Sequence, residues 1–130
     1  MIVLDTHAWV WWVLDTGELS KAQVQAIADD KNGTIGISAI SCWEIAKLTE
    51  YGRLELPLGV SEWFRIALAY PKVELLPLTP EIAVESTQLP DDFHRDPADQ
   101  IIVATSRVYQ CALVSSDDKI LKYPHVSTVY

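Results

Sequence analysis

Short apolar segments alternate with longer helical patterns along this chain, and this alternation limits the folds that are open to it. Runs of strand length occur at residues 2–4, 34–37, 73–78, 112–115 and 127–129. Strands that alternate with helices in this way predict an α/β fold, with a central, mainly parallel sheet of four to five strands flanked by helices. A chain of 130 residues suits one compact domain, which we expect to span residues 1–130.

Local signals predict where several of the helices begin and end. Ser20 opens a capping-box pattern, Thr79 precedes a proline and an acid, and Asp96 precedes Pro97. Ser38 is a better cap than Ser41 for the helix that should stop near Gly52, because Ser38 directly follows a strand. Pro77 places the third strand at an edge of the sheet, since proline cannot donate to a strand ladder.

The charge balance and the cysteines narrow the class of protein. The net charge is −8, from 18 acidic and 10 basic residues, which argues against broad, non-specific binding to nucleic acid. It leaves room for a nuclease whose negative potential is concentrated in a metal pocket. Cys42 and Cys111 are isolated and predict reduced thiols in a cytoplasmic protein. The apolar stretch 8–14 is too short for a membrane span and lacks the basic flank of a signal peptide.

Acidic side chains occur where strands pass into helices: Asp5, Glu44, Asp96, Asp99 and Asp117. In a parallel sheet these transitions share one edge, so acids far apart in sequence are expected to meet there. Two carboxylates about 4 Å apart repel by roughly 4 kcal/mol at an effective dielectric of 20. A helix N-terminus stabilises a nearby carboxylate by only about 0.3 to 1 kcal/mol. A cluster of such oxygens without Cys or His favours Mg²⁺, with Mn²⁺ as a substitute.

Four of the five acids also have a structural explanation to be weighed, and Asp5 is the exception. Asp96 is explained as a helix cap, and Asp99 as an acid in the first turn of the same helix. Glu44 falls in the second turn of its helix, where the alternative to a functional role is a surface pair with Lys47. Asp5 directly follows a buried strand, where an unpaired carboxylate is costly. Turn formation explains one of the two neighbours Asp117 and Asp118. We expect Asp117 to be the one that points toward the other acids.

With these residues in view, the chain resembles PIN-domain ribonucleases, and among them the VapC-type toxins of type II toxin–antitoxin systems. The likeness spans nearly the whole chain and rests on the order of four segments: Leu4-Asp5-Thr6-His7, Ser38-Ala39-Ile40-Ser41-Cys42-Trp43-Glu44, His94-Arg95-Asp96-Pro97-Ala98-Asp99 and Leu113-Val114-Ser115-Ser116-Asp117. The acidic metal-site positions of that family match Asp5, Glu44, Asp99 and Asp117, with Asp96 as an additional acid. Similar proteins often carry Arg where this chain has Gln100.

The resemblance implies a Mg²⁺-dependent endoribonuclease that hydrolyses RNA phosphodiester bonds with metal-activated water. Asp5, Asp99 and Asp117 would be metal ligands, and Glu44 a ligand directly or through water. Three residues would support them: Thr6 by orienting a water, and Arg95 and Lys119 by contacting phosphate. The resemblance also implies a homodimer that a cognate antitoxin holds inactive, with no membrane association. The tryptophans at positions 9, 11 and 12 are candidates for the dimer or antitoxin contact.

Other functions are compatible with parts of the pattern. A phosphatase could use Asp5 as a covalent nucleophile, but it normally has a second acid two residues later, where this chain has His7. A receiver-like signalling domain would have its acceptor Asp after the third strand, where residues 76–78 carry none. A non-catalytic PIN-like binding module is the non-enzymatic alternative. The presence of every acid of the family pattern argues against it.

Overall fold

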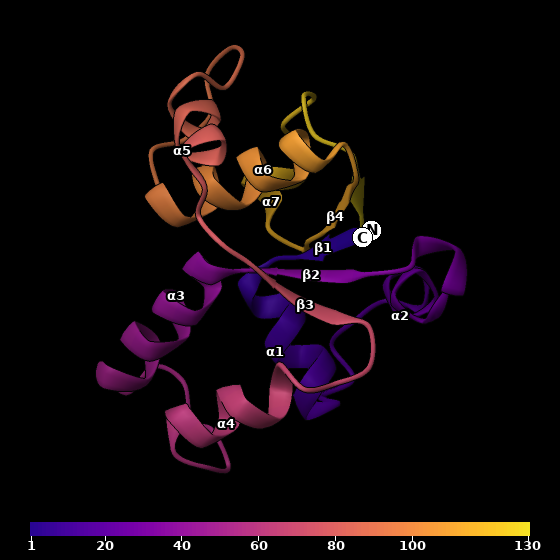
Figure 1. The fold of residues 1–130 in the computed structure, drawn as a ribbon, viewed down its shortest axis with the longest axis vertical. Helices are drawn as coiled ribbons and strands as arrows, with labels where there is room; N and C mark the ends of the chain where they lie inside the picture. The colour runs from indigo at the N-terminus through magenta and orange to yellow at the C-terminus, as the bar shows by residue number, and fades with distance from the viewer.

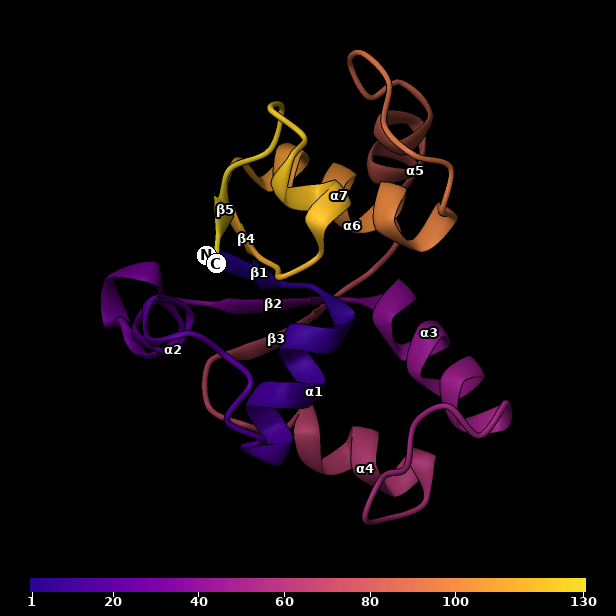
Figure 2. The same cartoon turned by 180° about the vertical axis from the view of Figure 1, so that it is seen from behind.

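A central sheet of five parallel strands organises the protein, and the computed structural model describes all residues 1–130. The spatial order is β3-β2-β1-β4-β5 (Figures 1 and 2). The strands are β1 (Ile2–Leu4), β2 (Ile35–Ser38), β3 (Val73–Leu76), β4 (Ala112–Val114) and β5 (Thr128–Val129). The α/β architecture is therefore confirmed, and the sheet is wholly rather than mainly parallel.

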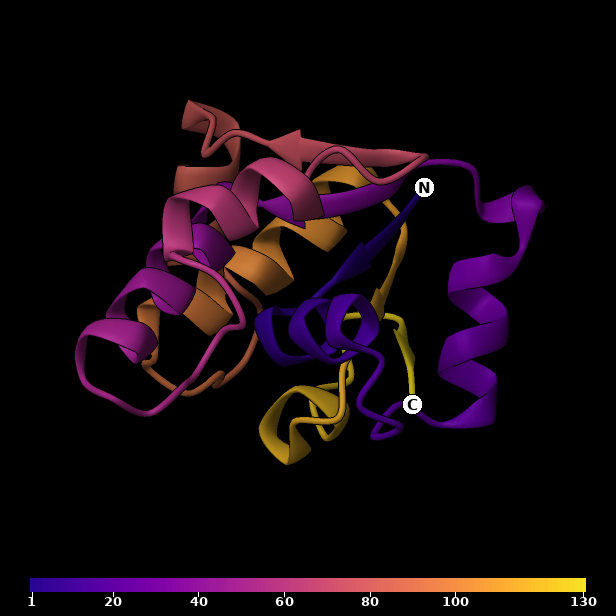
Figure 3. The same cartoon turned by 90° about the horizontal axis from the view of Figure 1, so that it is seen from below.

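Helices connect the strands and cover the sheet. They are α1 (Thr6–Leu14), α2 (Lys21–Ala28), α3 (Ala39–Glu50), α4 (Val60–Ala67), α5 (Pro80–Thr87), α6 (Pro97–Tyr109) and α7 (Asp118–Leu121), with a short 3₁₀ helix at Asp30–Asn32. In the ribbon, α5, α6 and α7 lie on one side of the sheet, with α1 and α4 on the other (Figures 1 and 2). The helices α2 and α3 stand at opposite ends of the molecule (Figure 3).

The pleat of β1 divides the core into two clusters. Ile2 and Leu4 pack with Trp9 and Ile45 on one face, while Val3 packs with Ile102 on the other. Successive side chains of a strand point to opposite faces, so a short central strand contributes to both clusters. The middle strand of the sheet thus carries Asp5 at its carboxyl end, between the two halves of the core.

The predicted helix boundaries are largely confirmed. Ser20 forms both bonds of its capping box with Gln23, and Thr79 caps α5 through the amide of Ile82. Ser38 rather than Ser41 caps α3, as expected. That helix ends at Glu50, and Gly52, with φ +69, lies just beyond its C-cap, where the Arg53 amide bonds the Leu48 carbonyl in a Schellman motif. β3 is an edge strand, in agreement with the position of Pro77.

The buried amide of Gln23 links α2 to the strand ends near the acids. Its Nε2 lies 3.1 Å from the Ser115 carbonyl oxygen and 3.3 Å from that of Val129. The Ser115 hydroxyl in turn accepts the Asp117 amide at 3.0 Å. This chain of contacts holds the turn after β4, which carries Asp117. The four-residue α7 that follows was not predicted.

The tryptophans of α1 do not act as one surface cluster. Trp9 is 0% exposed and packs against Trp63 and Phe64, with ring centroids 5.1 and 6.1 Å away. The expectation that Trp9 contacts another chain is therefore wrong, because its side chain is fully buried in the core. Trp11 and Trp12 remain partly exposed. None of the helices has the length and apolar character needed to cross a membrane.

Candidate metal-binding site

Asp5 occupies the most enclosed position among the five acids. It follows β1 directly, is 6% exposed, and accepts the Ala8 amide through Oδ1 at 2.9 Å. Burial raises the pKa of the Asp5 carboxyl, whereas hydrogen bonds from Ser115 and Ala8 lower it. Asp5 is thus the N-cap of α1, a structural role that the sequence interpretation did not assign to it.

Glu44 projects from the second turn of α3 toward the start of α1. Its Oε1 accepts the Thr6 hydroxyl at 2.5 Å, and the Thr6 oxygen lies 3.0 Å from that of Ser41. A hydroxyl has one hydrogen, so with Thr6 donating to Glu44 the Ser41 hydroxyl donates to Thr6. Lys47 instead pairs with Glu50 at 3.3 Å, which excludes the surface pair considered for Glu44.

Asp96 and Asp99 mark the start of α6. Asp96 is the N-cap, and its Oδ1 accepts the Asp99 amide at 3.0 Å. The Asp99 side chain is 19% exposed, and its Oδ2 lies 2.9 Å from Nε2 of His94. That distance suits an ion pair, but the contact lacks the alignment of a hydrogen bond. The predicted capping role of Asp96 is confirmed.

Asp117 also caps a helix. Its Oδ1 accepts the amides of Lys119 and Ile120 at 2.9 and 3.3 Å, at the start of α7. Three of the five acids, Asp5, Asp96 and Asp117, are therefore N-caps. Each cap contact to a backbone amide uses Oδ1 of the carboxylate.

The five acids act on one another electrostatically. The pKa of Asp99 is raised to about 7, first by burial and then by the charges of Asp96, Asp117, Glu44 and Asp5. The pKa of Glu44 is also raised, mainly by burial, with Asp96 and Asp5 adding to the effect against the Thr6 hydrogen bond. The charges of all four other acids thus raise the pKa of Asp99, as expected for groups gathered at one edge of the sheet.

The chemistry of this donor set fits a hard divalent cation. Carboxylate oxygens are the ligands that Mg²⁺ and Mn²⁺ prefer, and a cation would offset the repulsion that raises the pKa of Asp99. The side chains are not arranged as a finished coordination shell. Nowhere do three or more His, Cys, Asp or Glu side chains stand in an arrangement that could hold a metal ion. Oδ2 of Asp99 lies 2.9 Å from His94, so one oxygen of this carboxylate already has a partner.

His94 and Gln100 belong to this site, although sequence reasoning gave neither a role there. The Gln100 side chain donates to the His94 carbonyl at 3.0 Å, which ties the loop before α6 to its first turn. The His94 ring lies against Phe93, with centroids 4.6 Å apart. The closeness of His94 to the Asp96–Asp99 segment was the available signal, but only the loop conformation brings its ring to Asp99.

The three predicted supporting residues differ in their surroundings. Thr6 is 3% exposed and holds Glu44, so its hydroxyl is already engaged by side chains. Arg95 and Lys119 are exposed and take part in none of the ion pairs within 4 Å. Both neighbour acids of the site in the sequence, and neither side chain has a carboxylate partner.

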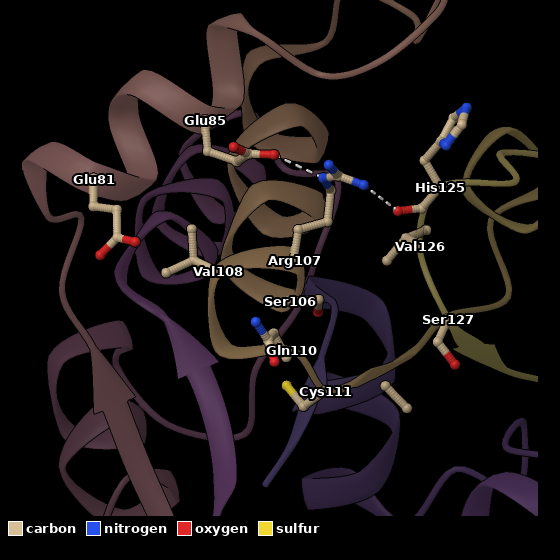
Figure 4. Close-up of a pocket in the computed structure, with 11 residues that line it drawn as sticks. Glu81, Glu85, Ser106, Arg107, Val108, Gln110, Cys111, His125, Val126 and Ser127 are labelled. Carbon is tan, nitrogen blue, oxygen red and sulfur yellow. Dashed lines mark hydrogen bonds and ion pairs between the residues drawn. The ribbon is translucent and has the colours of Figure 1, made fainter.

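A larger cavity lies away from the acids, where β4 and β5 begin. It measures about 560 Å³ and is lined by the end of α6 and by residues 125–127 (Figure 4). Arg107 crosses it, with contacts of 2.7 Å to Glu85 and 2.6 Å to the His125 carbonyl. Because its guanidinium is already engaged on both sides, Arg107 links α5 to the segment before β5.

Comparison with known proteins agrees with the fold. The family model described as PIN domain matches residues 2–126. This chain therefore belongs to the PIN-domain family. Within that family it is 33% identical over 126 residues to Ribonuclease VapC22 of Mycobacterium tuberculosis, covering 95% of this chain and 92% of the relative.

Solved structures share the fold at lower sequence identity. VapBC2 of Rickettsia felis, crystallised with a promoter DNA fragment, has a TM-score of 0.70 and 17% identity over 98% of this chain and 97% of that one. A toxin–antitoxin complex from Klebsiella pneumoniae has a TM-score of 0.66 and 20% identity, covering 100% and 97%. FitAcB of Neisseria gonorrhoeae has a TM-score of 0.64 and 18% identity, covering 100% and 97%.

Proposed function

We propose that this protein is a Mg²⁺-dependent endoribonuclease and the toxin of a toxin–antitoxin pair. The observation that carries the proposal is the convergence of five carboxylates on one sheet edge, with the pKa of Asp99 raised to about 7 by its acidic neighbours. The relative named as a ribonuclease supports RNA as the substrate. Mn²⁺ is expected to substitute for Mg²⁺, since both prefer oxygen ligands.

The proposed roles follow from how each side chain is held. Asp5, Asp99 and Asp117 are metal ligands, Glu44 acts directly or through water, and Asp96 is a weaker candidate. When bound, Mg²⁺ supplies Lewis-acid chemistry that activates water and offsets negative charge on the phosphate. Capping through Oδ1 keeps Asp5 and Asp117 in place. Thr6 fixes the direction of Glu44 through its hydroxyl.

Cleavage of RNA by the purified chain should depend on Mg²⁺ and on Asp5. We expect Asp5→Asn to lower the rate at least about 100-fold, because outer-shell changes alone cost about 10 to 100-fold. Asparagine caps helices as well as aspartate does, so α1 should remain intact. Cleavage of a labelled RNA is measured with Mg²⁺, with Mn²⁺ and with EDTA. The control is Asp118→Asn, which removes an exposed charge that pairs with Lys122.

The same experiment separates the alternative functions. Equal cleavage by wild type and Asp5→Asn would contradict the metal-nuclease proposal. No Mg²⁺-dependent cleavage together with tight binding to a neighbouring gene product would favour the non-catalytic binding module. Release of phosphate from a phosphomonoester through a phosphorylated Asp5 would indicate the phosphatase. The 6% exposure of Asp5 and its capping bond disfavour a nucleophilic role.

An antitoxin partner is part of the proposal, and the α1–α2 side of the protein offers a surface for it. Trp11, Trp12, Leu19 and Val24 line an apolar cavity of about 220 Å³ there. Val24 is 50% exposed, although it is apolar. Neighbouring proteins of the same fold were solved as toxin–antitoxin complexes, which supports a partner of that kind.

Trp11→Ala is expected to weaken binding of the antitoxin at least about tenfold, because tryptophan side chains at interface centres often contribute 2 kcal/mol or more. The measurement is calorimetric titration with the product of the gene directly upstream. Trp43→Ala serves as a matched control, since Trp43 is 53% exposed on α3. Unchanged affinity and unchanged oligomeric state in Trp11→Ala would remove this surface from the proposal.

A homodimer and a cytoplasmic location complete the proposal. Trp11 and Trp12 are candidates for the dimer contact as well, and sedimentation of the Trp11→Ala protein distinguishes the two uses. Cys42 and Cys111 form no disulfide. Free thiols are usual in a reducing compartment, which supports the cytoplasm.

A further inference from the structure

A small cavity adjoins the acidic site on the α7 side. It measures about 270 Å³ and is lined by Asp92, Phe93, His94, Lys119, Lys122, Tyr123 and Pro124. Two of its residues also touch the acids. His94 lies 2.9 Å from Asp99, and the Lys119 amide is bonded to Asp117 at 2.9 Å. A group seated in this cavity would therefore be a direct neighbour of the carboxylates.

Aromatic rings form one wall of this cavity. The Phe93 ring lies 4.6 Å from the His94 ring and 4.8 Å from the Tyr123 ring, centroid to centroid. Tyr123 is 5% exposed and its hydroxyl bonds the Pro90 carbonyl, so it anchors the wall from behind. Phe93 and His94 are half-buried and leave part of their surface open. Such partly exposed rings suit stacking of a nucleobase.

Two lysines, Lys119 and Lys122, line the cavity together with one acid, Asp92. Lys119 is exposed and has no carboxylate within ion-pair distance. Lys122 pairs with Asp118 at 2.8 Å, but both side chains are about three-quarters exposed, so water screens the pair. Lys119 thus remains available for a phosphate in a protein whose net charge of −8 otherwise repels nucleic acid.

We propose that this cavity is a nucleotide subsite, in which one base packs against Phe93 while its phosphate meets Lys119. Its volume lies below the range of about 300 to 1,000 Å³ that is usual for drug-sized ligands, which favours a single nucleotide. The inference deepens the proposed function, because it places one nucleotide of a single-stranded RNA beside the carboxylates. Double-stranded RNA does not fit, since its bases are not free to leave the stack.

Binding of mononucleotides tests the subsite without any cleavage. Adenosine 5′-monophosphate, ribose 5-phosphate and inorganic phosphate are titrated into the full chain in EDTA, and amide resonances are followed by NMR. We expect shifts at Phe93, His94, Lys119 and Tyr123. The nucleotide should bind about tenfold more tightly than ribose 5-phosphate, the difference expected for one stacked base.

Two variants separate the base from the phosphate. Phe93→Leu keeps an apolar side chain and should weaken the nucleotide alone, whereas Lys119→Ala should weaken all three ligands. Lys31→Ala, an exposed cation at the 3₁₀ helix, is the matched control and should change nothing. Thermal melting of each variant checks that it folds. If Phe93→Leu does not fold, Lys119→Ala alone tests the proposal.

The outcomes distinguish this inference from the proposed nuclease function. Equal affinity for the nucleotide and inorganic phosphate, or shifts elsewhere on the protein, would overturn the subsite even if the chain cleaves RNA. Nucleotide binding with the expected variant effects would support the subsite even if RNA remains intact, in which case the nuclease proposal alone fails.

Discussion

Asp99→Asn is expected to stabilise the metal-free protein at pH 8 while reducing RNA cleavage at least about 100-fold. The Asp99 carboxyl is the group that burial and four neighbouring acids penalise most clearly, since its pKa rises from 3.8 to about 7. An amide of the same shape removes the charge and can keep an oxygen toward His94. A side chain that is costly to the fold yet kept acidic fits a role in binding a cation.

The sign and size of this effect follow from proton linkage. Below about pH 4 the carboxyl is protonated in both the folded and the unfolded chain, so the variant gains nothing there. Between about pH 4 and 7 the unfolded chain releases this proton first, and the wild type loses stability as pH rises. At about 1.4 kcal/mol per pKa unit the full cost is about 4 kcal/mol at pH 8. We expect a net gain of about 2 kcal/mol, because part of the His94 contact is lost.

Urea unfolding of both proteins in EDTA from pH 4 to 8 measures this difference directly. The gap between them should open with pH, and added Mg²⁺ should stabilise the wild type more than the variant. Asp118→Asn is the control, since its charge lies outside the cluster and is exposed. Parallel pH profiles for wild type and Asp99→Asn would show that the acids do not strain the fold.

Trp9→Ala is expected to lower the free energy of unfolding by about 3 to 5 kcal/mol, the range found when a large core side chain is truncated. Trp9 is 0% exposed and lies between α1 and α4, against Trp63 and Phe64. Its loss leaves a cavity beneath the middle of the sheet. That cost is a large fraction of the total stability of a domain of this size.

Equilibrium unfolding of three variants tests this assignment. Trp9→Phe retains a ring and removes an indole nitrogen that has no hydrogen-bond partner, so it should cost about 1 to 2 kcal/mol. Trp43→Ala, at 53% exposure, should change stability by less than about 0.5 kcal/mol. A small effect of Trp9→Ala, similar to that of Trp43→Ala, would contradict its place in the core.

The helix caps illustrate what local sequence can predict. Ser20, Thr79 and Asp96 each bond an amide three residues away, so their roles depend on a few neighbouring residues. The edge position of β3 was predictable from Pro77 for a similarly local reason. The short α7 escaped prediction, because four residues carry too little periodicity to be recognised.

The grouping of the five acids was predictable from the sequence, but the parts played by His94 and Gln100 and the pKa of each acid were not. That the acids share an edge follows from the parallel connections, which the strand–helix alternation already indicated. Which acid is most strongly perturbed did not follow. Asp5 was the sharpest case in sequence, but its cap and the Ser115 hydrogen bond offset part of its burial cost. Asp99, for which the sequence offered both a first-turn role and a place among the metal ligands, is the acid whose pKa reaches about 7.

The sequence by itself determined the α/β class, the helix starts and the acids that gather at one sheet edge, because these depend on periodicity and on neighbours along the chain. Only the tertiary structure decided that Trp9 is core, that His94 faces Asp99, and that Thr6 holds Glu44. These facts depend on contacts between residues that are separated in sequence or joined by an irregular loop. Burial and electrostatic repulsion depend on that three-dimensional neighbourhood. No local sequence pattern could therefore show which residue is most buried or which acid is most strongly perturbed.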